Sequence, residues 1–226
     1  MGKVTHVLFD MDGLLLDTEA VYTQVTTEIL ARYGKTFEWS LKKQMMGRKE
    51  HDSAVLLVET TGIPLTPEEY LVERKKGHEK LFPFCKPLPG VMKLVRHLKQ
   101  HNIPIIVATS SHKDAFLLKS KNNTELFDLF DGKIVVGDDP RVHKGKPSPD
   151  IFLVAAEELG AKDHSTCLVF EDSGPGVIAG LNAGMQVVWV PDERFEITDE
   201  MRQKCAKVVT SLEQFNPEEF GLPPYQ

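Results

Sequence analysis

Two aspartates, Asp10 and Asp12, are separated by a single residue and directly follow a short apolar run near the start of the chain. One carboxylate of such a pair can attack an electrophile while the other transfers a proton. Gly13 follows and lets the backbone turn sharply. A calcium loop is excluded, because that motif requires a third acidic position and a later glycine. An isolated Asp-x-Asp pair more often caps a turn or a helix, so its role depends on the polar residues that the fold brings beside it.

Two later apolar runs also end in polar residues, and a lysine lies in a loop rich in glycine and proline. Thr109 and Ser110 follow residues 105–108, Lys146 lies within residues 145–150, and Glu171 and Asp172 follow residues 167–170. Phosphoryl transfer requires a carboxylate nucleophile, a divalent cation held by carboxylates, and donors around the phosphate oxygens. Thr109 or Lys146 alone would usually be an ordinary strand-end or loop residue. Together with the carboxylates, they meet all three requirements.

Four apolar runs rich in β-branched residues are predicted to be strands buried on both faces, at residues 7–9, 105–108, 134–136 and 167–170. Amphipathic helical patterns lie between and after these runs. This alternation predicts an α/β fold with a doubly wound, Rossmann-like parallel sheet. Because ligands bind beyond the carboxyl ends of such strands, we expect the polar residues that follow them to meet in one crevice.

Residues 18–82 interrupt this alternation, because their pattern is helical throughout and is broken only at turn-forming glycines. We therefore predict two domains: a catalytic core of residues 1–17 and 83–226, and an inserted all-helical cap of residues 18–82. Substrate choice should reside in the cap, since the core acts on the phosphoryl group alone. Arg48 is the candidate for contact with a polar or anionic part of the substrate. An exposed position at the start of a helix is an equal alternative for this arginine.

The composition is that of an ordinary globular protein. The 226 residues include 41% hydrophobic and 27% charged side chains, enough for a substantial apolar core. The net charge of −6 excludes a global positive field that would recruit a nucleic-acid polymer or an anionic membrane. The sequence shows no bilayer-spanning apolar stretch, no secretion leader and no Cys-x-x-Cys pair among its three cysteines. We expect a cytoplasmic protein that acts as a monomer on a small molecule.

The chain as a whole resembles the haloacid dehalogenase (HAD) superfamily of phosphohydrolases, in the branch that carries an inserted helical cap. The matching motifs are Asp10-x-Asp12-Gly13, Thr109 after an apolar strand, Lys146, and Glu171-Asp172, in this order. The resemblance implies that Asp10 attacks phosphorus and forms an aspartyl-phosphate, while Asp12 protonates the leaving alcohol and then accepts a proton from water. It also implies that Thr109, the N–H groups around Ser110, and Lys146 bind the phosphoryl group.

The same resemblance implies Mg²⁺ as the cofactor. The ion would be held by the Asp10 side chain, the Asp12 main-chain carbonyl and Asp172, with waters and the substrate phosphate completing an octahedron. Glu171 would belong to the metal site as a residue that supports the direct ligands. These expectations together describe a magnesium-dependent phosphomonoesterase.

Three segments resemble the pseudouridine-5′-phosphatase subgroup of the superfamily and its FMN phosphatase relatives, namely residues 9–19, 137–152 and 220–223. This likeness implies a nucleotide-like 5′-monophosphate, such as pseudouridine-5′-phosphate, as the substrate. Relatives that act on sugar phosphates share the same core, so a sugar-phosphate phosphatase stays open. A β-phosphoglucomutase-like phosphomutase also stays open, although Tyr22 stands where that branch has a histidine.

An alternative of another class is a non-catalytic phosphoaspartyl switch or binding module. Receiver domains of that kind also gather carboxylates, threonine and lysine on a doubly wound sheet. They are smaller, lack a cap, and need no second carboxylate two residues beyond the phosphoacceptor, so Asp12 favours the enzyme. Asp138 and Asp139 follow the apolar run 134–136, and the sequence assigns them no role.

Overall fold

The computed structural model describes residues 3–45, 50–192 and 198–225 and divides into two compact units. The core unit comprises Met1–Asp17 with Lys86–Gln226, and the helical unit comprises Thr18–Cys85. The 3₁₀ helix η1 (Phe82–Phe84) falls in the helical unit. The helical unit therefore ends at residue 85, where the sequence had placed the boundary at residue 82.

The described part of the helical unit contains η1 and four α-helices, α1 (Thr18–Ala31), α2 (Trp39–Met45), α3 (Glu50–Thr61) and α4 (Pro67–Leu81). Helix α4 packs against both α1 and α3. It begins with a capping box, in which Thr66 and Glu69 each satisfy the other's backbone N–H group. The buried hydroxyls of Thr26 and Tyr70 are hydrogen-bonded between α1 and α4 at 3.1 Å. The predicted all-helical insertion is confirmed.

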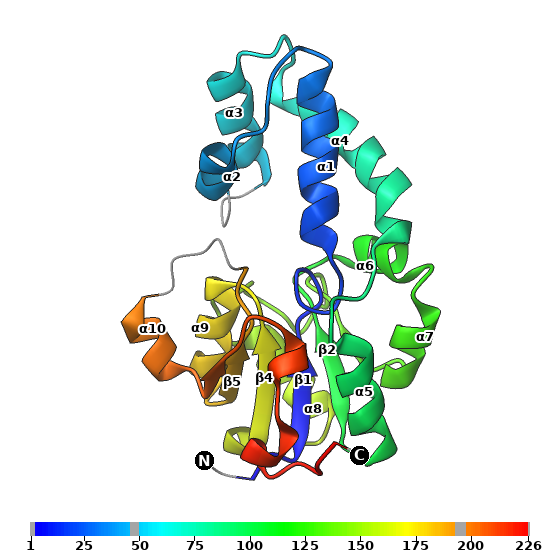
Figure 1. The fold of residues 1–226 in the computed structure, drawn as a ribbon, viewed down its shortest axis with the longest axis vertical. Helices are drawn as coiled ribbons and strands as arrows, with labels where there is room; N and C mark the ends of the chain where they lie inside the picture. Colours follow the sequence, from blue (N-terminus) through cyan, green and yellow to red (C-terminus); the bar gives the residue numbers. More distant parts are fainter. Residues whose placement is uncertain (1–2, 46–49, 193–197, 226) are drawn as a thin grey trace. The chain divides into compact units, whose positions relative to one another are not determined.

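The core unit is built on a parallel sheet of six strands in the order β3-β2-β1-β4-β5-β6 (Figure 1). The strands are β1 (His6–Phe9), β2 (Ile105–Ala108), β3 (Ile134–Val135), β4 (Cys167–Glu171), β5 (Gln186–Trp189) and β6 (Lys207–Val208). Every neighbouring pair is parallel. The order reverses direction at β1, so the predicted doubly wound α/β sheet is confirmed.

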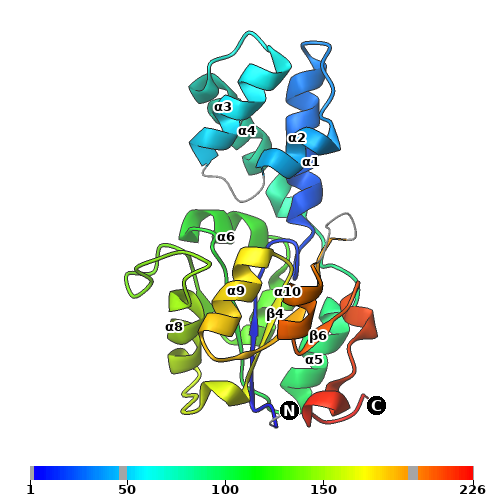
Figure 2. The same ribbon diagram turned by 90° about the vertical axis from the view of Figure 1, so that its left-hand side faces the viewer.

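Helices cover both faces of this sheet. The described helices of the core unit are α5 (Val91–Gln100), α6 (Lys113–Ser120), α7 (Thr124–Phe127), α8 (Asp150–Glu158), α9 (Gly174–Asn182) and α10 (Asp199–Lys204), with 3₁₀ helices η2 (Asp128–Phe130), η3 (His164–Thr166), η4 (Leu212–Gln214) and η5 (Pro217–Phe220). Figure 2 shows α8 on one side of the sheet and α5 on the other. This layering places the sheet at the centre of the core unit.

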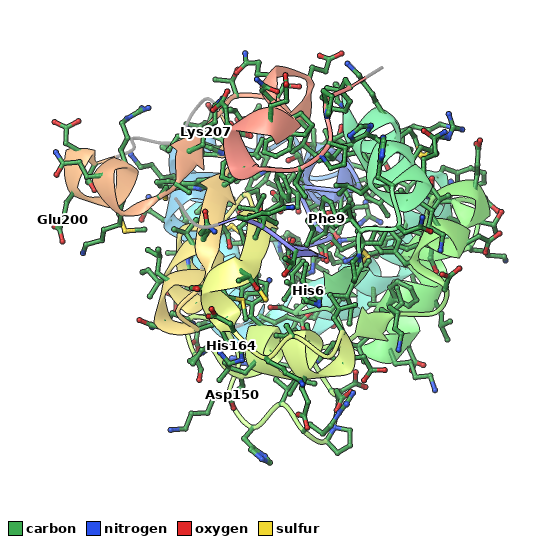
Figure 3. All side chains as sticks on the ribbon, turned by 90° about the horizontal axis from the view of Figure 1, so that it is seen from below. His6, Phe9, Asp150, His164, Glu200 and Lys207 are labelled. Carbon is green, nitrogen blue, oxygen red and sulfur yellow. The ribbon has the colours of Figure 1, made fainter. Side chains whose placement is uncertain are left out.

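Alternate side chains of β1 pack into two different apolar layers, as the pleat of a strand requires. Leu8 joins the cluster formed with residues of α8 and α9. Phe9 lies in the opposite layer, where its ring stacks on Phe170 at 5.0 Å and meets Phe130 edge-on at 5.9 Å. Figure 3, seen from below, places Phe9 in the middle of the packed side chains. Both faces of β1 are therefore buried over Val7–Phe9, which explains why these residues form an unbroken apolar run.

The chain leaves and re-enters the core unit at neighbouring points. The Asp17 N–H group donates to the Lys86 carbonyl at 2.9 Å, and the Leu88 N–H group donates to the Leu15 carbonyl at 3.1 Å. The helical unit is thus inserted between two backbone segments that are hydrogen-bonded to each other. Across the described residues, we find no helix with the length and apolar character that a bilayer crossing requires.

Candidate active site

The loops after β1 and β4 lie side by side at the carboxyl edge of the sheet. Phe9 is in register with Phe170, and the Asp10 N–H group donates to the Phe170 carbonyl at 3.0 Å. Asp10 therefore stands next to Glu171, the last residue of β4. Gly13 has a φ of 78°, in the left-handed region that glycine adopts without strain. The turn predicted after the two aspartates is present.

Lys146 links the two buried carboxylates of Asp10 and Glu171. Its Nζ donates to Asp10 Oδ1 at 2.5 Å, to Glu171 Oε1 at 2.7 Å and to the Ala108 carbonyl at 3.3 Å. Only 6% of the Lys146 side chain is exposed, against 8% for Asp10 and none for Glu171. The loop lysine singled out in the sequence therefore lies at the centre of the site.

Burial and neighbouring charges move the pKa values of this group in a consistent way. Burial raises the pKa of Asp10 to about 7, because it outweighs the attraction of Lys146, and Glu171 and Asp12 add repulsion. Burial alone would lower the pKa of Lys146, but the carboxylates of Asp10 and Glu171 outweigh it and raise that pKa. The lysine therefore stays charged, whereas its buried surroundings disfavour the ionised form of the Asp10 carboxyl.

Glu171 is held on both of its oxygens. Oε1 accepts from Lys146, and Oε2 accepts from the N–H group and the hydroxyl of Ser173 at 2.9 and 3.0 Å. Its carboxylate also lies against the backbone of α9, because a Cβ atom at Gly176 would stand 1.7 Å from Oε1. Glycine at position 176 therefore makes room for the Glu171 carboxylate.

A second network surrounds Asp12. Its Oδ2 accepts from the Ser111 hydroxyl at 2.8 Å and from the Thr109 hydroxyl at 3.4 Å, and its Oδ1 accepts from Lys119 Nζ at 2.5 Å. Thr109 and Lys119 are fully buried. The sequence pattern predicted a role for Thr109 but for neither Ser111 nor Lys119. In the sequence, Lys119 is distinguished only by its place one helical turn after Phe116, which puts both residues on the same side of α6. This signal is weak.

The other candidates have simpler surroundings. Ser110 is exposed, and its backbone carbonyl lies so close to Gly137 that a Cβ atom there would stand 2.2 Å away. Asp138 accepts from the Lys113 N–H group at 2.8 Å at the start of α6. Asp139 binds the guanidinium of Arg141. Arg48 lies outside the described residues.

The site meets the requirements of a divalent cation. Asp10, Glu171 and Asp172 each offer a carboxylate oxygen, and these oxygens lie within 4.8 Å of one another. Lys119 pairs with Asp12, and Lys146 pairs with Asp10 and Glu171. Asp172 adds a fourth carboxylate beside the last two, so the site contains four carboxylates and two ammonium groups when all are ionised. The resulting excess of two negative charges matches a hard divalent ion, which prefers oxygen ligands.

A doubly wound sheet with a buried Asp–Lys–Glu network at its carboxyl edge, and a helical insertion directly after the first strand, defines the class of cap-bearing phosphohydrolases. Comparison with known protein families supports the same class. The family model described as haloacid dehalogenase-like hydrolase matches residues 4–184. The chain belongs to this family, as its motifs predicted.

Individual relatives agree with this assignment over the full chain. The chain is 49% identical to (DL)-glycerol-3-phosphatase 2 of Arabidopsis thaliana, across all of this chain and 94% of that protein. It is 46% identical to a probable pseudouridine-5′-phosphatase of Drosophila melanogaster, across all of this chain and 97% of that protein. These relatives and the family make the protein a phosphatase enzyme.

A solved structure supports the fold. A HAD family hydrolase from Deinococcus radiodurans, determined with bound phosphate and sodium, superposes with a TM-score of 0.84. The match covers 99% of this chain and 100% of that chain at 23% identity. At this level of identity the comparison supports the architecture alone.

Proposed function

We propose that the protein is a magnesium-dependent phosphomonoesterase that works through an aspartyl-phosphate on Asp10. The observation that carries this proposal is the placement of the Asp10 carboxylate, buried at the edge of the sheet with one oxygen held by Lys146 at 2.5 Å. A desolvated carboxylate held beside a fixed cation is suited to attack a phosphorus atom whose charge that cation helps to neutralise.

The reaction proceeds in two steps in this proposal. In the first, an Asp10 oxygen bonds to phosphorus, the ester P–O bond breaks, and the leaving alcohol takes a proton from Asp12. In the second, water attacks phosphorus and gives a proton to Asp12, while the bond to Asp10 breaks and inorganic phosphate leaves. Lys146 and the Thr109 hydroxyl bind the phosphoryl oxygens, and Thr109 stands close to this path because it also contacts Asp12.

The residues present fit a magnesium ion. We assign its ligands to the Asp10 side chain, the Asp12 main-chain carbonyl and Asp172. Glu171 has its two oxygens on Lys146 and Ser173, so we give it the task of fixing these neighbours. When bound, the ion supplies positive charge to the phosphoryl oxygens.

The substrate proposed from the sequence is a nucleotide-like 5′-monophosphate such as pseudouridine-5′-phosphate. The 46% identical relative supports it, since that protein is named for this activity. Glycerol 3-phosphate is the second candidate, because the 49% identical relative is named for that substrate. We assign the choice between them to the helical unit, with Arg48 as the candidate residue.

The test is release of inorganic phosphate from a panel of esters, with and without Mg²⁺. The panel contains both candidate substrates, FMN and several sugar phosphates. Asp10→Asn keeps the size of the side chain and removes the nucleophile, and Asp128→Asn makes the same change at an exposed position. We expect magnesium-dependent release that is lost in the first variant and kept in the second.

Other outcomes of this assay decide between the alternatives. Activity that survives Asp10→Asn would rule out the proposed mechanism. Conversion of a sugar phosphate into its isomer without phosphate release would identify a phosphomutase. Stable phosphorylation of the protein with neither product would identify a phosphoaspartyl switch.

We further propose that the enzyme acts in the cytoplasm as a monomer. Its three cysteines are free thiols, as in proteins of reducing compartments. Cell fractionation and gel filtration test these two points, and an exported or dimeric protein would contradict them.

A further inference from the structure

Lys119 is a buried lysine of the site that the reaction steps above do not use. We propose that Lys119, together with Ser111, is a positioning residue that holds the Asp12 carboxylate in place for proton transfer to the leaving alcohol. This inference rests on the proposed function, since it assigns Asp12 the proton-transfer step.

The contacts form a closed triangle. Lys119 Nζ donates to Asp12 Oδ1 at 2.5 Å and to the Ser111 hydroxyl at 2.9 Å, and that hydroxyl donates to Asp12 Oδ2 at 2.8 Å. Both carboxylate oxygens of Asp12 are therefore held, each by a different donor. Because a carboxylate turns about two side-chain bonds, two separate anchors fix its orientation as well as its place.

The helix that carries Lys119 is itself fixed at both ends. Asp138 accepts from the Lys113 N–H group at the start of α6, and Asn123 donates its side-chain N–H to the Lys119 carbonyl at 3.1 Å. The ring of Phe116 packs edge-on against Phe127 at 5.3 Å. Lys119 thus presents its ammonium group to Asp12 from a rigid support. Figures 1 and 2 show α6 at the end of the core unit toward which the strands run.

Stability alone does not account for a lysine at this position. Burying an ammonium group carries a desolvation cost, and a buried ion pair can often be replaced by apolar side chains without loss of stability. Lys119 has 1% of its side chain exposed, whereas Asp12 keeps 24%. The lysine is wholly enclosed while the carboxylate that it holds reaches solvent. This is the arrangement expected of a support placed behind a reacting group.

The effect on rate follows from geometry. A displacement of about 1 Å in a reacting group can lower a rate by roughly a hundredfold. Without Lys119, Oδ1 of Asp12 loses its ammonium donor, whereas the hydroxyls of Ser111 and Thr109 both contact the other oxygen, Oδ2. The Asp12 carboxylate could then rotate about Oδ2, and Oδ1 would lose its fixed position relative to the leaving alcohol.

The experiment compares two kinds of leaving group in Lys119→Met, Ser111→Ala and wild type. Glycerol 3-phosphate releases an alkoxide that needs a proton, whereas p-nitrophenyl phosphate releases a stable phenolate that does not. We expect the ratio of kcat/KM for the alkyl ester to that for the aryl ester to fall by about tenfold or more in Lys119→Met. The ratio should fall in the same direction in Ser111→Ala. A merely structural role would lower both values together.

The controls separate this inference from the proposed function. In Asp12→Asn, the ratio of kcat/KM for the alkyl ester to that for the aryl ester should fall furthest, because the proton donor itself is removed. Lys204→Met changes an exposed lysine of α10 that pairs with Glu200, and it should leave this ratio unchanged. If Lys119→Met does not fold, Ser111→Ala decides, because it leaves no buried charge unpaired. An unchanged ratio in the folded variants would overturn the inference. Wild-type protein that hydrolyses neither these esters nor pseudouridine-5′-phosphate with Mg²⁺ would instead overturn the proposed function.

Discussion

Replacing Gly176 by alanine tests the packing around the buried Glu171 carboxylate. Gly176 lies in the first turn of α9, and a Cβ atom there would stand 1.7 Å from Glu171 Oε1 and 1.9 Å from its carboxylate carbon. Glu171 is fully buried and cannot turn toward solvent. We expect Gly176→Ala to push the carboxylate away from Lys146 and Ser173.

Two opposing effects determine how much Gly176→Ala changes the free energy of unfolding. Alanine stabilises a helix interior by about 1 kcal/mol relative to glycine, so a gain is the ordinary expectation. Breaking a buried ion pair so that a charge is left unpartnered costs about 3–5 kcal/mol. The loss dominates, and the free energy of unfolding should fall by about 2–4 kcal/mol. For a protein of this size, the melting temperature should fall by roughly 10 °C.

The assay is urea unfolding followed by circular dichroism, with phosphate release measured in parallel. The matched comparison introduces Gly176→Ala into Glu171→Ala protein, where the carboxylate that would clash is absent. In that background the alanine should cost nothing or add stability, so the two substitutions should be strongly coupled. An equal penalty in both backgrounds would refute the close packing of Glu171 on α9.

Two further predictions follow from charges described above. Lys146→Met leaves two buried carboxylates without their shared cation, so the free energy of unfolding should fall by about 3–5 kcal/mol and phosphate release should be lost. A free energy of unfolding in urea equal to that of wild type would contradict this prediction. Hydrogen bonds from Arg141 lower the pKa of Asp139 to about 2, so this pair should stabilise the protein above about pH 4 and cease to do so as the pH falls toward 2. Asp139→Asn should therefore lose stability relative to wild type at pH 5 but not near pH 2, and an equal difference at both values would exclude the pair as the cause.

Local sequence pattern was enough to predict the fold class. The four apolar runs correspond to β1–β4, because strands buried on both faces must be apolar throughout. Strand β5 is also apolar over Val187–Trp189, but it was not among the four runs that were predicted to be strands. Strand β6 is only two residues long and is defined by its pairing with β5, so its own sequence carries no periodic signal.

The site was predictable where chemistry follows a strand end directly. Asp10 and Glu171 could be brought together from sequence because parallel strands present their carboxyl ends at one edge. Lys119 could not, since it reaches Asp12 from a helix 107 residues away and only tertiary packing turns it inward. The neighbouring residues Ser110 and Ser111 could not be told apart from sequence either. Only the fold determines that Ser111 contacts Asp12 while Ser110 is exposed.

The hydrogen bond between Asp17 and Lys86 has an evolutionary consequence. Because the two ends of the inserted segment are already adjacent, connections of very different length can join them, and the entropy of loop closure rises only slowly with length. The helical unit also has its own buried residues, such as Val25 and Tyr70, so its packing can change without compensating changes in the sheet. Residues 18–85 can therefore be exchanged as one unit, and the proposed division of tasks implies that such an exchange would alter substrate choice without rebuilding the sheet and its carboxyl edge.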